Sequence, residues 1–313
     1  RFGIEEYLEK KLRGIPGARH LEVNAYGRTV RELRKENSKS GENIKLSIDI
    51  ELQKYLYSVL KNKSGSIVAI NVQNGEIIGM TSAPSFDPNF FHQGLSESEW
   101  ESLSKDPLSP LVNKAISGEY SPGSTFKMIV LLSAFKNKIL KKNSSILSTS
   151  KFKLGDRTFY CWCHKKKTGC YAARNRQRRV KPKLALAQSC DCFFYELSRR
   201  IGIRKIADTA LNFGIGKKTG INLQGESAGL VPTKSWKKKH IGKSWQLGET
   251  IITGVGQGYI TSTPLQLALA TAIIANNGKK ISPKINLKES NFETNEINND
   301  IDRSLIKVFC SNL

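Results

Sequence analysis

The stretch Tyr120-Ser121-Pro122-Gly123-Ser124-Thr125-Phe126-Lys127 places a serine and a lysine three residues apart, just before the apolar run 128–132. The Pro-Gly break and the run behind it predict a buried helix over 124–138. Residues i and i+3 share one helix face, so Ser124 and Lys127 are expected within hydrogen-bond reach. A buried, neutral lysine can take a proton from a hydroxyl, and free N–H groups at the helix start can stabilise an oxyanion. The stretch therefore predicts a serine nucleophile, although the same spacing is common by chance on protein surfaces.

A second polar group stands before another apolar helix. Ser189 and Asp191 are two residues apart, and the segment 192–201 behind them predicts a helix. At such a junction both side chains can face one cleft. Ser189 is then a candidate to relay a proton between Lys127 and a leaving amine, and Asp191 to orient Lys127 or the substrate. The alternative is that one of them only caps the helix.

The composition describes a globular and strongly basic chain. Its 313 residues carry 50 Lys and Arg against 27 Asp and Glu, a formal charge of +23. Such an excess favours anionic partners, among them substrates that carry carboxylates. The basic residues are scattered and no nucleic-acid-binding motif accompanies them, so no nucleic acid partner is expected. No apolar window approaches the ~18 residues of a membrane span. Because the chain opens at Arg1 without a methionine or signal peptide, we expect a segment of a longer protein.

Six cysteines raise the question of a metal. Cys161, Cys163, His164 and Cys170 offer four zinc ligands within ten residues. Their spacing matches no common zinc signature, so disulfide pairing or chance clustering stays open. Serine chemistry itself requires no cofactor.

The rest of the pattern indicates an α+β fold. Residues 1–44 are polar, and 31–41 are expected to form a solvated connector. Asp49 predicts a helix cap, and 65–80 predict two antiparallel strands joined at Asn74-Gly75. Residues 83–123 are loop-rich with a short helix from Ser96, and further helices are expected over 182–188 and after Pro264.

These features occur together in one family. A serine–x–x–lysine motif, a middle serine motif and a Lys-Ser/Thr-Gly motif mark the penicillin-binding proteins and related β-lactamases. The chain resembles the class B penicillin-binding proteins, and within them the penicillin-binding protein 2 group. The resemblance covers most of the chain and rests on the segments 12–17, 48–53, 85–89, 120–127, 189–195, 214–226, 254–259 and 263–266.

The resemblance implies a function and a role for each site residue. Ser124 would be the acylated nucleophile, Lys127 its base, Ser189 the middle-motif serine, and Asp191 would stand where many relatives have asparagine. The expected activity is that of a peptidoglycan D,D-transpeptidase in cell elongation and shape. The enzyme acylates its serine with the penultimate D-Ala of a stem peptide ending in D-Ala-D-Ala and transfers it to an amine; β-lactams mimic that terminus.

The resemblance also implies an organisation and a location. The fold would be the penicillin-binding-protein/β-lactamase-like transpeptidase fold, an antiparallel sheet with helices. Residues 1–44 would be the remnant of an N-terminal pedestal (dimerisation) domain and its connector, and 45–313 a C-terminally incomplete transpeptidase domain. The protein would act at the periplasmic face of the bacterial inner membrane through an anchor outside this segment, with a membrane glycosyltransferase as partner.

The third motif is where the chain departs from the family. Lys-Ser/Thr-Gly triplets begin at Lys39, Lys63, Lys167 and Lys218, but none stands after the helix that follows Pro264. We therefore expect the motif and its strands to be absent, and the chain alone to acylate poorly with β-lactams. A two-stranded sheet is also marginal without partners.

Several alternatives stay open. The chain is also interpretable as a catalytically impaired fragment of a split or decayed gene, as a serine β-lactamase or β-lactam sensor, or as a binding module. Residues 1–44 argue against the β-lactamase and sensor interpretations, since those domains lack a pedestal. The basic stretch 165–181 is longer than in the family; a solvated insertion, a nucleic-acid patch or a shifted reading frame would explain it.

Overall fold

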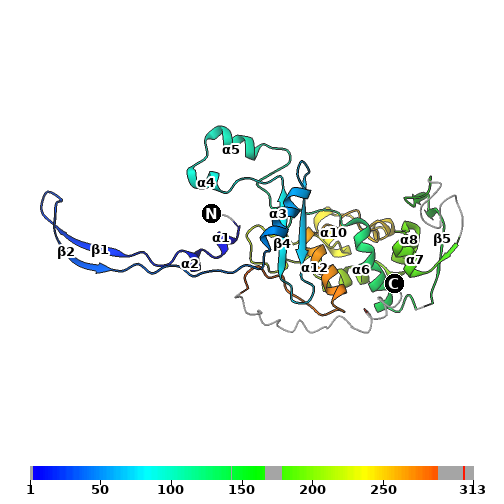
Figure 1. The fold of residues 1–313 in the computed structure, drawn as a ribbon. Coiled ribbons are helices and arrows are strands. Elements are labelled where there is room, and N and C mark those ends of the chain that lie inside the picture. Colours follow the sequence, from blue (N-terminus) through cyan, green and yellow to red (C-terminus); the bar gives the residue numbers. More distant parts are fainter. Residues whose placement is uncertain (1–2, 142, 166–177, 288–305, 307–313) are drawn as a thin grey trace.

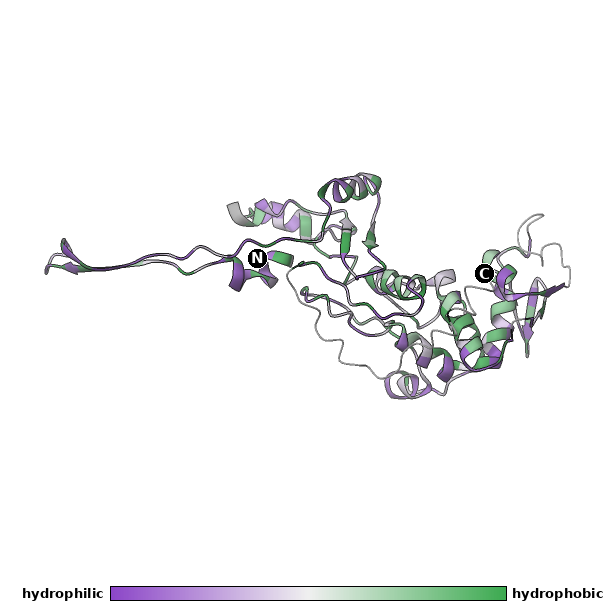
Figure 2. Ribbon diagram, turned by 60° about the horizontal axis from the view of Figure 1, so that its bottom comes forward, coloured by the Kyte–Doolittle hydropathy of each residue, from purple (hydrophilic) through white to green (hydrophobic). Residues whose placement is uncertain are grey.

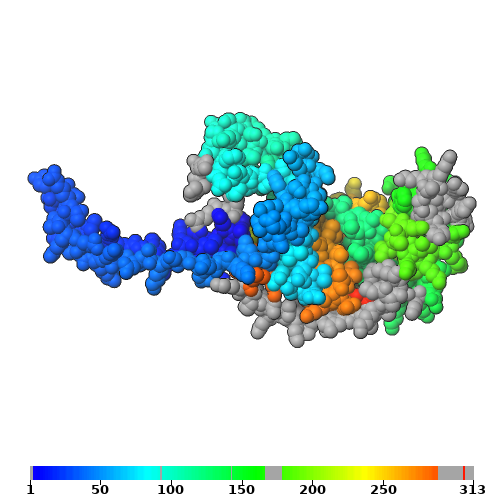
Figure 3. All heavy atoms as spheres, viewed as in Figure 1, coloured from blue at the N-terminus to red at the C-terminus, as the bar shows by residue number. Residues whose placement is uncertain are grey.

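The computed structural model describes residues 3–141, 143–165, 178–287 and 306. Two short helices, α1 (Gly3–Tyr7) and α2 (Glu9–Leu12), lead into a hairpin of β1 (Ala18–Val23) and β2 (Thr29–Glu36). This hairpin projects from the rest of the molecule as an arm (Figures 1 and 3). The two strands pair antiparallel from Ala18↔Glu36 to Val23↔Thr29.

The arm corrects the expectation of a solvated connector over 31–41. Every residue of β2 is exposed, as expected, yet residues 31–36 of the predicted connector form part of this strand, while 37–41 lie beyond it and outside any named strand. The alternation that normally reveals a strand arises because one face is buried, and here neither face is. Cross-strand pairs such as Arg31 with Glu22 contribute instead.

The hairpin predicted at Asn74-Gly75 is confirmed. β3 (Gly65–Ile70) and β4 (Ile77–Ala83) pair antiparallel, and Gly75 has a positive φ of 80°. The predicted cap is also present, because the Asp49 carboxylate accepts hydrogen bonds from two N–H groups in the first turn of α3 (Ile50–Val59). α3 lies along β4, and the Gln53 amide bonds both the N–H and the C=O of Met80. Among the described residues this sheet has two strands.

Helices form most of the remaining fold. The loop-rich part contains α4 (Asn89–Gln93) and α5 (Glu97–Ser104), and Ser96 forms the capping box of α5. The predicted helix over 124–138 is a 3₁₀ turn, η1 (Gly123–Phe126), continued by α6 (Lys127–Lys136). The other predicted helices are α7 (Pro182–Ala187), α8 (Asp191–Ile201) and α12 (Pro264–Ala275). Further helices are α9 (Ile203–Asn212), α10 (Lys234–Ile241) and α11 (Leu247–Thr253).

The hydrophobic core holds α6 and α8 in contact. Apolar side chains of α6, α8, α11 and α12 form one buried cluster, which includes Phe126, Leu132, Phe193 and Leu197. Figure 2 shows hydrophobic colour concentrated on these helices, while the arm is largely hydrophilic. Beside the helices lie two small ribbons, β5 (Ile146–Ser148) with β8 (Arg178–Val180) and β6 (Lys151–Leu154) with β7 (Arg157–Tyr160). No helix of the described residues has the length and apolarity that crossing a bilayer requires.

Candidate active site

Ser124 lies on a sharp turn whose backbone is hydrogen-bonded to the loop that contains Gly256. The residue is exposed within η1, after Gly123, which has a φ of +57°. The Gly123 N–H donates to the Gly256 carbonyl at 2.9 Å. A Cβ on Gly256 would stand 2.1 Å from the Gly123 oxygen, so only glycine permits this approach. Ser124 is therefore exposed to solvent on a backbone that the contact between Gly123 and Gly256 fixes.

Lys127 connects the predicted site residues. Its side chain is fully buried at the start of α6. The Nζ donates to Asp191 Oδ1 at 2.5 Å, to Ser189 Oγ at 2.8 Å and to the Ser189 carbonyl at 3.0 Å. Ser189 Oγ in turn donates to Ser124 Oγ at 2.8 Å. All four predicted residues are thus brought together, and the hydrogen-bonded link from Lys127 to Ser124 runs through Ser189, in place of the direct contact that the i,i+3 spacing led us to expect.

The junction between α7 and α8 places Ser189 and Asp191. Ser189 has a positive φ of 49°, a backbone conformation that is uncommon outside glycine and concentrates at functional sites. Asp191 is the first residue of α8, where the helix dipole favours a carboxylate. Its two oxygens accept from Lys127 and from the Trp162 N–H, so its role extends beyond helix capping.

The ion pair of Lys127 and Asp191 lies in apolar surroundings. The Asp191 side chain is 16% exposed, and the Phe194 ring centroid is 5.5 Å from Lys127 Nζ. A charge in such surroundings is tolerated because its partner and its hydrogen bonds replace water. Either residue alone would leave an uncompensated buried charge.

Trp162 is a site residue that the sequence pattern did not reveal. Its N–H donates to Asp191 Oδ2 at 2.9 Å, and its indole N–H donates to the Gln188 carbonyl at 3.2 Å. Trp162 comes from the segment after β7, far from α8 in sequence. No periodicity marks such a contact, although its neighbours Cys161 and Cys163 single out the segment.

Three of the four zinc candidates, Cys161, Cys163 and His164, follow directly after β7. Cys163 is disulfide-bonded, which leaves it no thiolate for a metal. His164 Nδ1 lies 2.9 Å from Ser150 Oγ, and Cys170 is outside the described residues. Within the described part of the chain no group of three His, Cys, Asp or Glu side chains has a metal-binding arrangement. Zinc binding by the four candidates stays a prediction for a state in which Cys163 is reduced.

Cys161 contacts two other cysteines. Hydrogen bonds from the Cys190 and Cys192 thiols hold the pKa of Cys161 at about 2, far below its ordinary value. The same contact and burial raise the pKa of Cys190 and of Cys192. Of the three thiols, Cys161 therefore has the lowest pKa.

Three of the four Lys-Ser/Thr-Gly triplets lie in the described part of the chain, and all three precede α12. Lys218-Thr219-Gly220 lies in an irregular loop after a turn at 213–216, and the Thr219 N–H and hydroxyl both donate to Glu226 Oε1 at 2.6 Å. The triplet at Lys63 leads into β3, and the one at Lys167 falls outside the described residues. The triplet that begins at Lys39 follows the arm hairpin.

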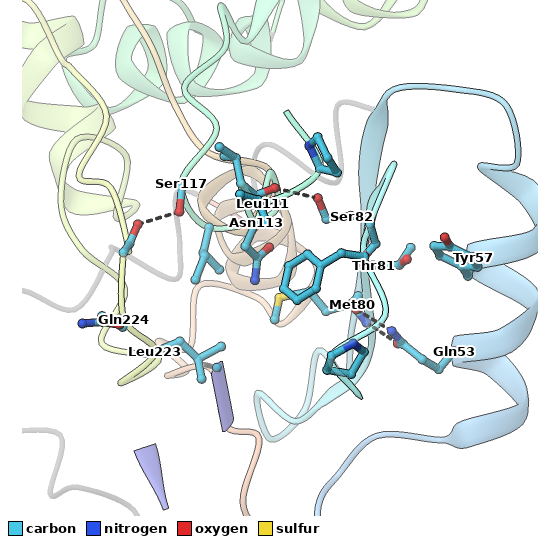
Figure 4. Close-up of a pocket in the computed structure, with 18 of the residues that line it drawn as sticks. Gln53, Tyr57, Met80, Thr81, Ser82, Leu111, Asn113, Ser117, Leu223 and Gln224 are labelled. Carbon is cyan, nitrogen blue, oxygen red and sulfur yellow. Dashed lines mark hydrogen bonds between the residues drawn. The ribbon is translucent and has the colours of Figure 1, made fainter. Parts of the chain in front are cut away.

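A separate cavity of about 830 Å³ opens between α3, β4 and the loops at 110–117 and 223–225 (Figure 4). Met80, Leu111 and Leu223 form apolar walls, with the Gln53 and Asn113 amides at its side. None of the four catalytic candidates lines it. Its size does not make it the active site, because the nucleophile and its partners lie elsewhere.

Comparison with known proteins identifies the class of this site. Residues 65–305 match the penicillin-binding protein transpeptidase domain, and residues 1–46 match the penicillin-binding protein dimerisation domain. The chain belongs to the penicillin-binding protein transpeptidase family.

Its relatives narrow the class to the penicillin-binding protein 2 group. The chain is 35% identical over 287 residues to peptidoglycan D,D-transpeptidase MrdA of Haemophilus influenzae, covering 91% of this chain and 42% of the relative. The identity to FtsI of Escherichia coli is 30% over 283 residues, covering 88% and 42%. Penicillin-binding protein 2 of Helicobacter pylori, solved in complex with MreC, matches with a TM-score of 0.85 at 30% identity, covering 100% of this chain and 56% of that one. The chain thus spans about half the length of the relatives it matches.

Proposed function

We propose that this chain carries the acylation centre of a peptidoglycan D,D-transpeptidase of the penicillin-binding protein 2 type. The observation that carries the proposal is the continuous hydrogen-bond chain from Ser124 through Ser189 and Lys127 to Asp191. Such a chain supplies an exposed hydroxyl with a buried route for its proton.

The geometry supports an order of events. For acylation the hydroxyls must turn from their resting directions, so that Ser124 donates to Ser189 Oγ and Ser189 donates to Lys127 Nζ. The Ser124 oxygen then attacks the carbonyl carbon of the penultimate D-Ala, and its proton passes to Ser189 Oγ as Ser189 gives its own proton to Lys127. Lys127 must be neutral to accept it, so its ammonium proton has first to move onto Asp191 Oδ1, 2.5 Å away. Collapse of the tetrahedral intermediate expels D-Ala, with the proton returned along the same chain to the leaving amine. The acyl-enzyme then reacts with the amine of a neighbouring stem peptide, and β-lactams stop the sequence at the acyl-enzyme.

Location and partners are proposed from the relatives. The named relatives are peptidoglycan enzymes, and peptidoglycan is built outside the cytoplasm. We place the site at the periplasmic face of the inner membrane, held there by an anchor outside this segment. A structure described as coordinating polymerisation and crosslinking in a peptidoglycan synthase complex matches 90% of this chain at 29% identity with a TM-score of 0.77. A glycosyltransferase is accordingly the proposed partner, and cell elongation the proposed process.

Acylation by fluorescent penicillin tests the proposal. We expect slow labelling of the purified chain, since no Lys-Ser/Thr-Gly motif follows α12, and an adduct on the tryptic peptide that contains Ser124. Ser124→Ala should abolish the adduct, whereas Ser121→Ala, a matched exposed serine three residues earlier, should label like the parent chain. Rapid labelling would contradict the expectation that the chain acylates poorly without the third motif. The absence of an adduct after prolonged incubation would contradict the proposed acylation centre and favour the interpretation as a catalytically impaired fragment.

A further inference from the structure

Four aromatic rings contact one another in series on α10 and on the segments that flank α11. His240 stacks on Trp236 with ring centroids 5.5 Å apart. Tyr259 contacts Trp236 at 5.4 Å and Trp245 at 6.5 Å. His240 is exposed and the other three residues are half-buried, so this aromatic series keeps part of its surface in solvent. It differs in this from the fully buried rings of the core.

The aromatic series is held in place by polar contacts behind it. The Trp245 indole N–H donates to Thr250 Oγ1 at 2.8 Å. Lys237 of α10 is buried and forms an ion pair with Glu249 of α11. These contacts fix α10 against α11, so the rings are positioned before any ligand arrives. Binding to such a preorganised surface loses little conformational entropy.

The surroundings of the aromatic series are basic. The segment 233–258 carries five lysines and a single acid, Glu249. Because Glu249 is paired with the buried Lys237, no carboxylate of this segment remains for the other four lysines. These four are exposed and are called here the rim lysines: Lys234, Lys238, Lys239 and Lys243. Their charge complements an anionic ligand.

The aromatic series also adjoins the loop that supports the nucleophile turn. Tyr259 is three residues after Gly256, whose carbonyl accepts the hydrogen bond from Gly123 N–H. Three residues of extended chain span at most about 11 Å. Gln257 and Gly258, which lie between them, are exposed. A polymer held on the aromatic series would therefore lie close to the turn that carries Ser124.

We propose that the aromatic series and the rim lysines form a subsite for the glycan strand of peptidoglycan, and this inference rests on the proposed function. The face of an aromatic ring is negative, which suits the weakly positive C–H face of a sugar ring. The free carboxylates of the stem peptides complement the rim lysines. A strand held here raises the effective concentration of its own stem peptides at Ser124.

Two other interpretations predict different behaviour. Rings that only pack together would stabilise α10 against α11, and the lysines would then form a solvated face without a ligand. Single-stranded nucleic acid also combines stacking with negative charge. We favour the glycan strand because the aromatic series adjoins the Ser124 turn.

Binding of soluble, uncrosslinked peptidoglycan strands to the full chain tests the role of charge. Isothermal titration calorimetry on Ser124→Ala gives the Kd without any acylation. The rim variant is Lys234→Gln/Lys238→Gln/Lys239→Gln. The control removes the same charge from exposed lysines elsewhere, as Lys61→Gln/Lys63→Gln/Lys136→Gln. We expect the rim variant to raise the Kd at least several-fold and to weaken its dependence on salt, and the control to bind like the parent. Equal binding by the rim variant and the control would overturn the subsite.

The rings need a separate measurement. His240→Ala removes the exposed end of the aromatic series and should raise the Kd several-fold, with folding confirmed by circular dichroism. Trp236→Ala should weaken binding further, and Trp236→Phe, which keeps an aromatic face, should restore most of it. A stem peptide without sugar should bind more weakly than the strand. Equal affinity of peptide and strand, or unchanged binding by His240→Ala and Trp236→Ala, would overturn the role of the rings.

Two further outcomes separate this inference from its competitors. An oligothymidylate that binds more tightly than the strands, and loses affinity in the rim variant, would assign the surface to nucleic acid instead. A chain that is labelled by penicillin at Ser124 but binds no strand would refute the subsite alone. A chain that binds strands but is never labelled would refute the proposed acylation and leave the strand-binding surface in place.

Discussion

Replacing Gly256 by alanine should destabilise the chain far more than the same change at Gly258, two residues later. Both glycines have a positive φ, 72° and 83°, so the backbone strain of an alanine is nearly the same in the two variants. That strain amounts to about 1 kcal/mol. Comparing the two variants therefore separates the cost of backbone strain from the cost of steric contact.

The contacts differ sharply. A Cβ at Gly258 meets only the side chain of Ile252, whose Cγ2 is 3.3 Å away and can shift slightly. A Cβ at Gly256 meets the Gly123 oxygen at 2.1 Å and the Gly123 nitrogen at 2.7 Å, both backbone atoms. The backbone segments around Gly123 and Gly256 must therefore move apart. This breaks the hydrogen bond from Gly123 N–H to Gly256 C=O, which contributes about 1 kcal/mol, and overpacking costs about 1–3 kcal/mol more. We expect a loss of about 3–5 kcal/mol for Gly256→Ala against about 1 kcal/mol for Gly258→Ala.

Urea unfolding, monitored by tryptophan fluorescence, measures the loss in free energy of unfolding for both variants. The dependence of that free energy on urea concentration should be the same in both, which shows that they unfold in the same two-state manner. The Gly256 variant should also lose Ser124 labelling by penicillin, since the turn that carries Ser124 is displaced. Losses of stability that agree within about 0.5 kcal/mol would refute the reasoning, because strain alone would then explain both variants.

Three further changes test the hydrogen-bond chain and its surroundings. Ser189→Ala should slow penicillin acylation by about 10²–10⁴-fold with folding retained, measured by labelling time course beside circular dichroism; unchanged labelling would remove Ser189 from the proton route. Lys127→Met should lower the free energy of unfolding by about 3–5 kcal/mol because Asp191 is left buried and unpaired, and Asp191→Asn in the same chain should restore part of it; an absence of rescue in urea unfolding would contradict the pair as the cause. Hydrogen bonds from Ser227 and Thr261 lower the pKa of Glu119 below its ordinary 4.5, so its contribution to stability is present above pH 4.5 and is lost as pH falls through the lower folded pKa. Glu119→Gln should accordingly flatten the fall in melting temperature over that acidic window, and an unchanged slope would count against it.

Local signals in the sequence were sufficient for much of the fold. Asp49 before α3, Asn74-Gly75 between two apolar runs and Ser96 before α5 each act within a few residues, and each lies where it was predicted. The arm strand over 29–36 was missed because a ribbon exposed on both faces shows no apolar alternation. Propensity and capping rules describe neighbours along the chain, and tertiary contact is invisible to them.

The site residues likewise divide into those that local spacing predicts and those that only tertiary contact brings together. Ser124 and Lys127 are three residues apart in one continuous segment, so local spacing is enough to mark their motif. The contacts that complete the site cross 62 residues from Lys127 to Ser189 and 65 from Ser189 to Ser124. The residues alone offered Ser189 and Asp191 as candidates beside Lys127, with helix capping as the alternative, and the resemblance to a known family favoured the pairing over the cap. The contact between Trp162 and Asp191 spans 29 residues, and Trp162 lies outside the segments that carry this resemblance, so neither local rules nor resemblance predicted it.

The described site contains all four residues of the hydrogen-bond chain, and this determines which step of acylation should be impaired. The nucleophile turn, the buried lysine and the start of α8 all rest on one apolar core, and none of their mutual contacts involves β3 or β4. A Lys-Ser/Thr-Gly strand would add a cation and a hydroxyl for the substrate carboxylate, and neither group is a member of the hydrogen-bond chain from Ser124 to Asp191. Loss of such a contact weakens binding of the substrate and its transition state, while the proton route of Ser124 is kept. Slow acylation that saturates only at high penicillin concentration is therefore what this arrangement implies, and a low rate that saturates at ordinary concentration would instead locate the defect in the Ser124–Ser189–Lys127 chain.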